Sequence, residues 1–139
     1  MPCHNSVIVD APADKVWSVI RDFSSTKWAP NVVTSHKNIG EKAGDQPGAK
    51  RVLNDAFHET LHSIDDINRT FSYSIDEGPA AVATAVNYVG TVALHPVTEN
   101  NTTLVVWTSK WDHSDGGVAE FCSPIYQALL GDLKAHFKK

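Results

Sequence analysis

The chain has 139 residues, of which 42% are hydrophobic and 20% charged, and its formal net charge is −4. This composition is typical of one globular domain, residues 1–139, with its own core, and the acidic balance argues against nucleic acid as a partner, because nucleic-acid binding needs a basic surface. The opening residues MPCHNSVIVDAP lack the regions of a signal peptide, and no segment is long and apolar enough to span a membrane, so we expect a cytoplasmic protein.

The first elements are a strand and a helix. Residues 6–9 form a short apolar run that predicts a strand, and Pro12 follows at a position suited to the start of a helix. Apolar residues then recur at helical spacing, at Val16, Trp17, Val19 and Ile20. Residues 23–30 predict a second short helix or a turn.

From residue 32 onward the apolar period becomes two, which indicates strands. The predicted strands span residues 32–38, 49–53, 57–64, 70–76, 84–97 and 103–112. The breaks between them are short and rich in turn-forming residues. Short connections of this kind predict an antiparallel meander.

The chain ends in a long amphipathic helix. Its apolar stripe comprises Val118, Phe121, Cys122, Ile125, Leu129, Leu133 and Phe137. Pro124 lies inside this pattern, and because the apolar period continues through it we expect a kinked helix rather than a new start. The elements together predict an α+β helix-grip fold: a curved seven-stranded antiparallel sheet wrapped around a long C-terminal helix, with two short helices after strand 1. A cavity between sheet and helix is expected.

Glu59 is the residue that does not fit its strand. Period-two alternation places it on the same face as Phe57 and Leu61, where a carboxylate is costly unless it is paired or hydrated. A three-residue turn at 54–56 would place Arg51 directly opposite Glu59, and a register slip by two would leave the pair on a diagonal, still within reach. Tyr73 is expected on the same concave face.

Two interpretations of this pair remain open. It is either a buried ion pair that fixes the register of the sheet or a polar pair at the floor of an apolar pocket. We favour the pocket, with Glu59 and Arg51 as the candidate catalytic residues if the protein is an enzyme.

The facing of the last two strands is ambiguous. In the first of these strands the large apolar residues fall on even positions, at Val86, Tyr88, Val92 and Leu94. In the next strand a second set falls on odd positions, at Trp107, Ser109 and Trp111. A symmetric hairpin through Asn100 would place these two sets on opposite faces. Either a bulge intervenes, for which Gly90 is the plausible position, or one of the two assignments is wrong; with a bulge, both sets could face inward.

Metal and cofactor chemistry finds little support. His58 and His62 share the face opposite to Glu59 and lack a third ligand, so we expect no metal site. Cys3 and Cys122 have no metal-ligand spacing and are expected to be reduced thiols. No motif predicts a redox cofactor, and none is expected.

Several stretches carry a family resemblance. These are APADKVWSVIRDF, PGAKRVL, ETLHSIDDINRTFSYSI, NYVGTVALHPV, TTLVVWTSKW and FCSPIYQALLGDL. They resemble START/Bet v 1-like (SRPBCC) proteins, and more narrowly the bacterial polyketide cyclase/dehydrase-like branch. The resemblance implies a helix-grip cavity for apolar molecules whose wall includes Arg51, Leu53, Glu59, Tyr73, Ile75, Tyr88, Trp107, Ser109, Phe121 and Ile125. Strand parity adds Leu61 and Trp111 to this predicted ligand-binding set.

Three functions follow as hypotheses. The first is binding of a small hydrophobic ligand of lipid, polyketide or aromatic type. The second is a cofactor-independent cyclase, dehydratase or isomerase, because the similar plant lachrymatory-factor synthase uses an arginine and a glutamate at the positions of Arg51 and Glu59. The third is a protein-interaction module whose pocket is filled by its own aromatic side chains.

Overall fold

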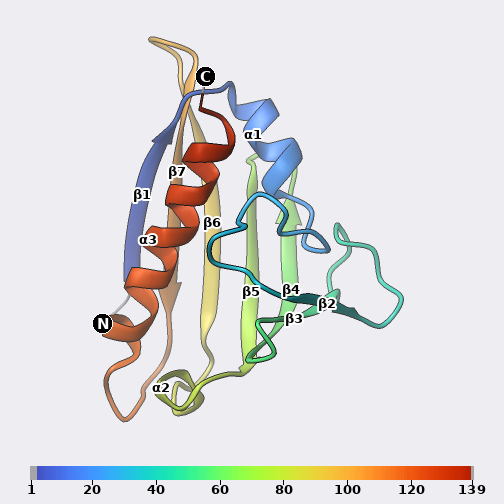
Figure 1. Ribbon diagram of the computed structural model, residues 1–139, viewed down its shortest axis with the longest axis vertical. Helices are drawn as coiled ribbons and strands as arrows, with labels where there is room; N and C mark the ends of the chain where they lie inside the picture. Colours follow the sequence, from blue (N-terminus) through green and yellow to red (C-terminus); the bar gives the residue numbers. More distant parts are fainter. Residues whose placement is uncertain (1–2, 139) are drawn as a thin grey trace.

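The computed structural model describes residues 3–138 and contains seven strands and three helices within them (Figure 1). In chain order these are β1 (Cys3–Val9), α1 (Ala13–Ile20), β2 (His36–Ile39), β3 (Lys50–Leu53), β4 (Phe57–Asp65), β5 (Thr70–Glu77), α2 (Ala80–Ala83), β6 (Val89–Val97), β7 (Thr102–Lys110) and α3 (Val118–His136). The strands form one antiparallel sheet in the order β1-β7-β6-β5-β4-β3-β2. The predicted α+β helix-grip fold is thereby confirmed.

The position of α3 decides where the core lies. The helix runs along β1 and β7, and its buried residues face the concave side of the sheet (Figure 1). Two register shifts between β4 and β5, at His58/Glu59 and at Leu61/Ser63, mark bulges. Bulges bend and twist a strand, so this half of the sheet can curve around the helix. α3 continues through Pro124, as its apolar period predicts.

The second short helix expected after β1 is not found in residues 23–30. That segment forms successive turns, with hydrogen bonds from the Ala29 amide to the Thr26 carbonyl and from the Val33 amide to the Ala29 carbonyl. Pro30 disfavours helical geometry at the residue before it, which explains the difference. The short helix lies instead at α2, which begins after Pro79.

Two predicted strands start later than expected. β2 begins at His36 rather than at residue 32, and β6 begins at Val89 rather than at residue 84. Asn87 has a left-handed backbone with φ 56° and separates α2 from β6. The other predicted strands are found with ends shifted by a few residues.

The expected bulge at Gly90 is wrong. β6 and β7 pair without interruption from Val89 to Val97, with Val92 opposite Trp107 and Gly90 opposite Ser109. The connection runs from Val97 to Thr102, and its four residues place even positions of β6 opposite odd positions of β7. The length of the turn, rather than a bulge, lets the buried residues Val92 and Leu94 of β6 and Trp107 and Ser109 of β7 share one face, whereas Val86 lies before β6 and is exposed.

Gly90 has a different role in the sheet. It lies opposite Tyr73 of β5, and a Cβ atom at residue 90 would lie 2.4 Å from Cζ of the Tyr73 ring. Glycine therefore lets the Tyr73 ring lie across the neighbouring strand, inside the core.

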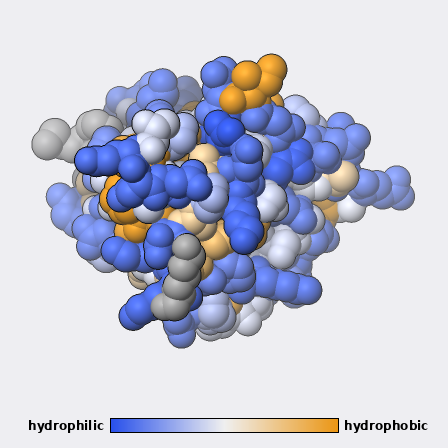
Figure 2. All heavy atoms as spheres, turned by 90° about the horizontal axis from the view of Figure 1, so that it is seen from above, coloured by the Kyte–Doolittle hydropathy of each residue, from blue (hydrophilic) through white to orange (hydrophobic). Residues whose placement is uncertain are grey.

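The surface at the end of the molecule that carries the β6–β7 turn is mostly hydrophilic, with small separate apolar patches (Figure 2). None of the helices within residues 3–138 is both long and apolar enough to cross a membrane.

Replacing Gly90 by alanine tests the packing of Tyr73. Because the added methyl group would overlap the Tyr73 ring, we expect Gly90→Ala to lower the free energy of unfolding by about 1–3 kcal/mol, measured by urea denaturation. Gly131→Ala is the matched control, since nothing lies within 4 Å of its Cβ position on α3. The control should gain about 0.5–1 kcal/mol from helix propensity. Equal effects of the two substitutions would contradict the packing argument.

Candidate functional site

The β3–β4 hairpin positions the two charged residues. Its turn joins Leu53 to Phe57, and Asn54 and Asp55 adopt left-handed backbones with φ 56° and 53°. Asparagine and aspartate tolerate this conformation better than most residues. The resulting register places Arg51 opposite Glu59, as the sequence predicts.

Arg51 and Glu59 form a buried ion pair. Arg51 Nε donates a hydrogen bond of 2.8 Å to Glu59 Oε1, and the two side chains are only 6% and 7% exposed. The same guanidinium donates through Nη1 to the Phe23 carbonyl at 3.2 Å, and its Cζ lies 3.8 Å from the centre of the Phe23 ring. Arg51 therefore holds both the hairpin and the segment after α1.

Burial raises the pKa of Glu59 above its ordinary value, because the charged carboxylate loses its hydration. The charge of Arg51 and its hydrogen bond act in the opposite direction, as does the smaller effect of His36. A carboxyl group with a raised pKa exchanges its proton closer to neutral pH, as general acid or base catalysis requires.

A small cavity lies beside this pair, between the sheet and α3. Its volume is about 50 Å³, counted as room for the centres of water-sized molecules. Its wall comprises Thr26, Trp28, Val32, Val33, Arg51, Leu53, Asn54, Phe57, Glu59, Tyr73, Ile75, Trp107, Cys122, Ile125, Tyr126 and Leu129. Seven of the predicted ligand-binding residues are therefore brought together here: Arg51, Leu53, Glu59, Tyr73, Ile75, Trp107 and Ile125.

Five predicted residues do not line the cavity. Leu61 is buried in the apolar core, and Ser109 is buried without a hydrogen-bond partner for Oγ among residues 3–138. Trp111 lies just beyond the end of β7 and stacks on Tyr88, with ring centroids 5.7 Å apart. Phe121 stacks on the cavity residue Phe57 at 6.4 Å.

The sequence reasoning missed three groups of cavity residues. On α3, Cys122, Tyr126 and Leu129 follow one another at helical spacing, and that stripe could have identified them. Asn54 and Phe57 lie at the turn of the β3–β4 hairpin, and the others, Thr26, Trp28, Val32 and Val33, belong to an irregular segment without apolar period.

This segment, residues 22–35, is called the cavity loop here; it crosses between α3 and the β3–β4 hairpin (Figure 1). On one side, the backbone N and Nδ2 of Asn31 donate to the two oxygens of Asp132 on α3, at 2.9 and 2.8 Å. On the other side, Asn54 Oδ1 accepts from the backbone N of Thr34 at 2.7 Å, and Asn54 Nδ2 donates to the Val32 carbonyl at 2.9 Å. Two polar anchors thus hold the loop over the cavity.

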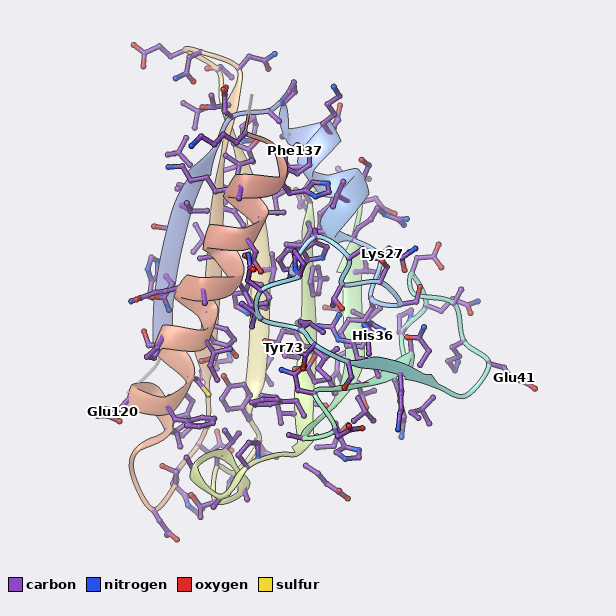
Figure 3. The ribbon with its side chains drawn as sticks, viewed as in Figure 1. Lys27, His36, Glu41, Tyr73, Glu120 and Phe137 are labelled. Atoms are coloured by element: carbon purple, nitrogen blue, oxygen red, sulfur yellow. The ribbon has the colours of Figure 1, made fainter. Side chains whose placement is uncertain are left out.

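A chain of buried hydroxyl groups reaches the wall of the cavity. Trp107 Nε1 donates to the Tyr73 hydroxyl at 3.0 Å, and Tyr73, labelled in Figure 3, donates to the Tyr126 hydroxyl at 3.0 Å. The Tyr88 and Tyr126 hydroxyls are also hydrogen-bonded to each other. Burial raises the pKa of all three phenols above their ordinary value, so they stay protonated.

The histidines of β4 lie away from this cavity. His58 Nε2 is 3.8 Å from Glu77 Oε2, and His62 Nε2 is hydrogen-bonded to Ser74 Oγ at 2.8 Å. Within residues 3–138, no group of three or more histidine, cysteine, aspartate or glutamate side chains is arranged to hold a metal ion.

Comparison with known proteins identifies the family. The family model described as polyketide cyclase/dehydrase and lipid transport matches residues 3–138, so the chain belongs to this family. None of the curated proteins matches significantly.

Solved structures with the same fold include a protein from Nitrosospira multiformis, which is 42% identical with a TM-score of 0.95 over 100% of this chain and 97% of that one. A solution NMR structure from Thermobifida fusca is 27% identical, with a TM-score of 0.81 over 98% and 92%. The protein XoxI from Bacillus cereus is 25% identical, with a TM-score of 0.80 over 98% and 94%.

The raised pKa of Glu59 makes a prediction about stability and pH. The folded state holds this proton more tightly than the unfolded chain, whose carboxyl pKa is near 4.5. The stabilisation is therefore complete below that value and is lost as the pH rises toward the folded pKa. We expect the free energy of unfolding of the wild type, relative to Glu59→Gln, to fall as the pH rises above about 4.5, measured by urea denaturation.

Glu99→Gln, at the exposed β6–β7 turn, is the control for removing a carboxylate and should show no such fall. If the difference between wild type and Glu59→Gln instead grew with pH, Arg51 rather than burial would dominate the titration of Glu59.

Proposed function

We propose that this member of the polyketide cyclase/dehydrase and lipid transport family binds a small, largely apolar molecule in the cavity between the sheet and α3. The observation that carries the proposal is the Arg51–Glu59 pair, which lies in the wall of a cavity that is otherwise mostly apolar. Ligand sites typically combine such an apolar wall with a few fixed polar groups that orient the ligand. We include the cytoplasmic location expected from the sequence in this proposal.

The ion pair is suited to orienting a polar group of the ligand. Arg51 donates to Glu59 Oε1, and this hydrogen bond does not use Oε2 of the same carboxyl group. A hydroxyl group of a ligand can donate to Oε2 without breaking the pair. Arg51 is held by Glu59, by the Phe23 carbonyl and by the Phe23 ring, so it positions the carboxylate rather than moving with the ligand.

The size of the cavity sets a condition on entry. The cavity offers about 50 Å³ to the centres of water-sized molecules, which leaves no room for a lipid or a polyketide. A ligand of that size requires the cavity loop to move away from α3. The bonds between Asn31 and Asp132 are the contacts that such a movement breaks first on the α3 side, while Asn54 holds the other side of the loop.

A second candidate function is catalysis by a cofactor-independent cyclase, dehydratase or isomerase. The raised pKa of Glu59, in a carboxyl group that lines the cavity, favours it. Glu59 would transfer a proton, and Arg51 or Tyr73 would stabilise an oxyanion or enolate. The interaction-module hypothesis is weaker, because the aromatic side chains leave the cavity partly unfilled.

Native mass spectrometry under gentle and then denaturing conditions tests the binding function. We expect a small apolar compound to be released from the purified wild type. Ile125→Trp should abolish the bound mass, because Ile125 lines the cavity and a larger side chain would fill it. Ala128→Trp, one turn further along α3 on its exposed face, should retain it.

A compound-free mass for the wild type would be followed by titration with 1-aminoanthracene, an apolar fluorescent probe. No enhancement of its fluorescence, or equal enhancement with Ile125→Trp, would contradict binding in this cavity. Circular dichroism of both tryptophan variants would verify that they fold.

Binding and catalysis make different predictions for Glu59→Gln. Glutamine keeps the size of the side chain, so the affinity for the released compound should change by less than about tenfold in either case. Turnover of that compound, followed by mass spectrometry of the products, should be abolished in Glu59→Gln only if Glu59 transfers a proton. Unchanged turnover would exclude Glu59 as the acid or base.

A further inference from the structure

Two hydrogen bonds join three buried hydroxyl groups, which leaves one hydroxyl proton without an acceptor among them. Tyr73 OH receives the indole N–H of Trp107 and is bonded to Tyr126 OH, which in turn is bonded to Tyr88 OH. Tyr73, Tyr126 and Trp107 line the cavity, whereas Tyr88 does not. All four side chains are almost completely buried, so an unused polar hydrogen cannot turn to bulk water.

The protons of this chain can be counted. Three hydroxyl groups carry three protons, and the two bonds between hydroxyls use two of them. One O–H therefore has no acceptor within the chain. Because Tyr73 donates to Tyr126, the spare proton lies on Tyr126 or on Tyr88, depending on which of these two hydroxyls donates to the other.

A ligand with an acceptor selects among these arrangements. When the spare proton lies on Tyr126, it can point into the cavity, whose wall includes this residue. An acceptor atom at that wall adds one hydrogen bond to this arrangement only. The ligand therefore shifts the hydroxyl chain toward it, at the cost of rotations about C–O bonds alone.

We propose that Tyr126, with Tyr73 donating to it from behind, is a hydrogen-bond donor site that selects ligands carrying a carbonyl or another neutral acceptor. The inference rests on the proposed binding function and adds the chemical class of the ligand. A neutral acceptor fits better than an anion, because Glu59 lines the same cavity and its negative charge acts on Tyr73. The phenols, being held neutral by burial, are donors without a countercharge.

Two small probes of the same shape test the donor site. Acetophenone and α-methylstyrene differ in having C=O or C=CH₂ at the same planar position. The dissociation constants of both would be measured by NMR titration, and the ratio of the two constants in each variant would be compared with the wild-type ratio. This comparison removes the difference in hydration between the two probes.

The variants follow from the proton count. Tyr73→Phe/Tyr126→Phe removes both hydroxyls that line the cavity, and we expect the preference for acetophenone to fall about three- to tenfold. Tyr88→Phe is the matched control, since two hydroxyls and one bond between them still leave one spare proton on a cavity residue. It should keep the wild-type preference.

The outcomes separate the two proposals. If α-methylstyrene binds but the double variant keeps the full preference for acetophenone, the donor site is refuted and the binding function stands. Loss of the preference in Tyr88→Phe would equally refute it, since the proton count would be wrong. If neither probe binds the wild type, the binding function fails and the donor site fails with it. Because tyrosine and phenylalanine are nearly isosteric, unchanged affinity for α-methylstyrene verifies that each variant keeps the cavity.

Discussion

The buried pair of Arg51 and Glu59 constrains this half of the molecule more than any apolar contact does. A buried charge must be paired, and a slip of the β3–β4 register by one residue would turn Glu59 to the opposite face and leave Arg51 alone in the core. The turn at Asn54 and Asp55 excludes that slip through its length. Arg51 also bonds to Phe23, so the same charge fixes the start of the cavity loop.

The cavity results from the way the sheet and the helix diverge. α3 runs along β1 and β7, and the β3–β4 hairpin lies to the side, beneath the cavity loop (Figure 1). Tyr73 fills part of the space between them, because Gly90 lets its ring lie across β6 and its hydroxyl reaches Tyr126 on α3. The remaining cavity is bounded by Arg51 and Glu59 on β3 and β4 and by Tyr73 and Tyr126 on β5 and α3.

The sequence predicted those parts of the site that depend on local rules. Strand parity and the turn at 54–56 place Arg51 opposite Glu59, and alternation places Tyr73 on the same face. The cavity loop could not be predicted, because its position depends on contacts such as Asn31 with Asp132, which are 101 residues apart in the chain. Trp111 has the parity of an inward residue, but β7 ends before it, and alternation no longer determines where its side chain lies.

The two polar parts of the cavity wall differ in a way that bears on ligand recognition. The hairpin offers an acceptor, Glu59 Oε2, whereas the tyrosines offer a donor. A hydrogen bond from a ligand to either group contributes about 0.5–1.5 kcal/mol. A ligand with one hydroxyl and one carbonyl group can bond to both, and a pure hydrocarbon can bond to neither. Apolar contact accordingly supplies the affinity of such a site, while these two polar groups determine which apolar molecule is retained and in which orientation it lies.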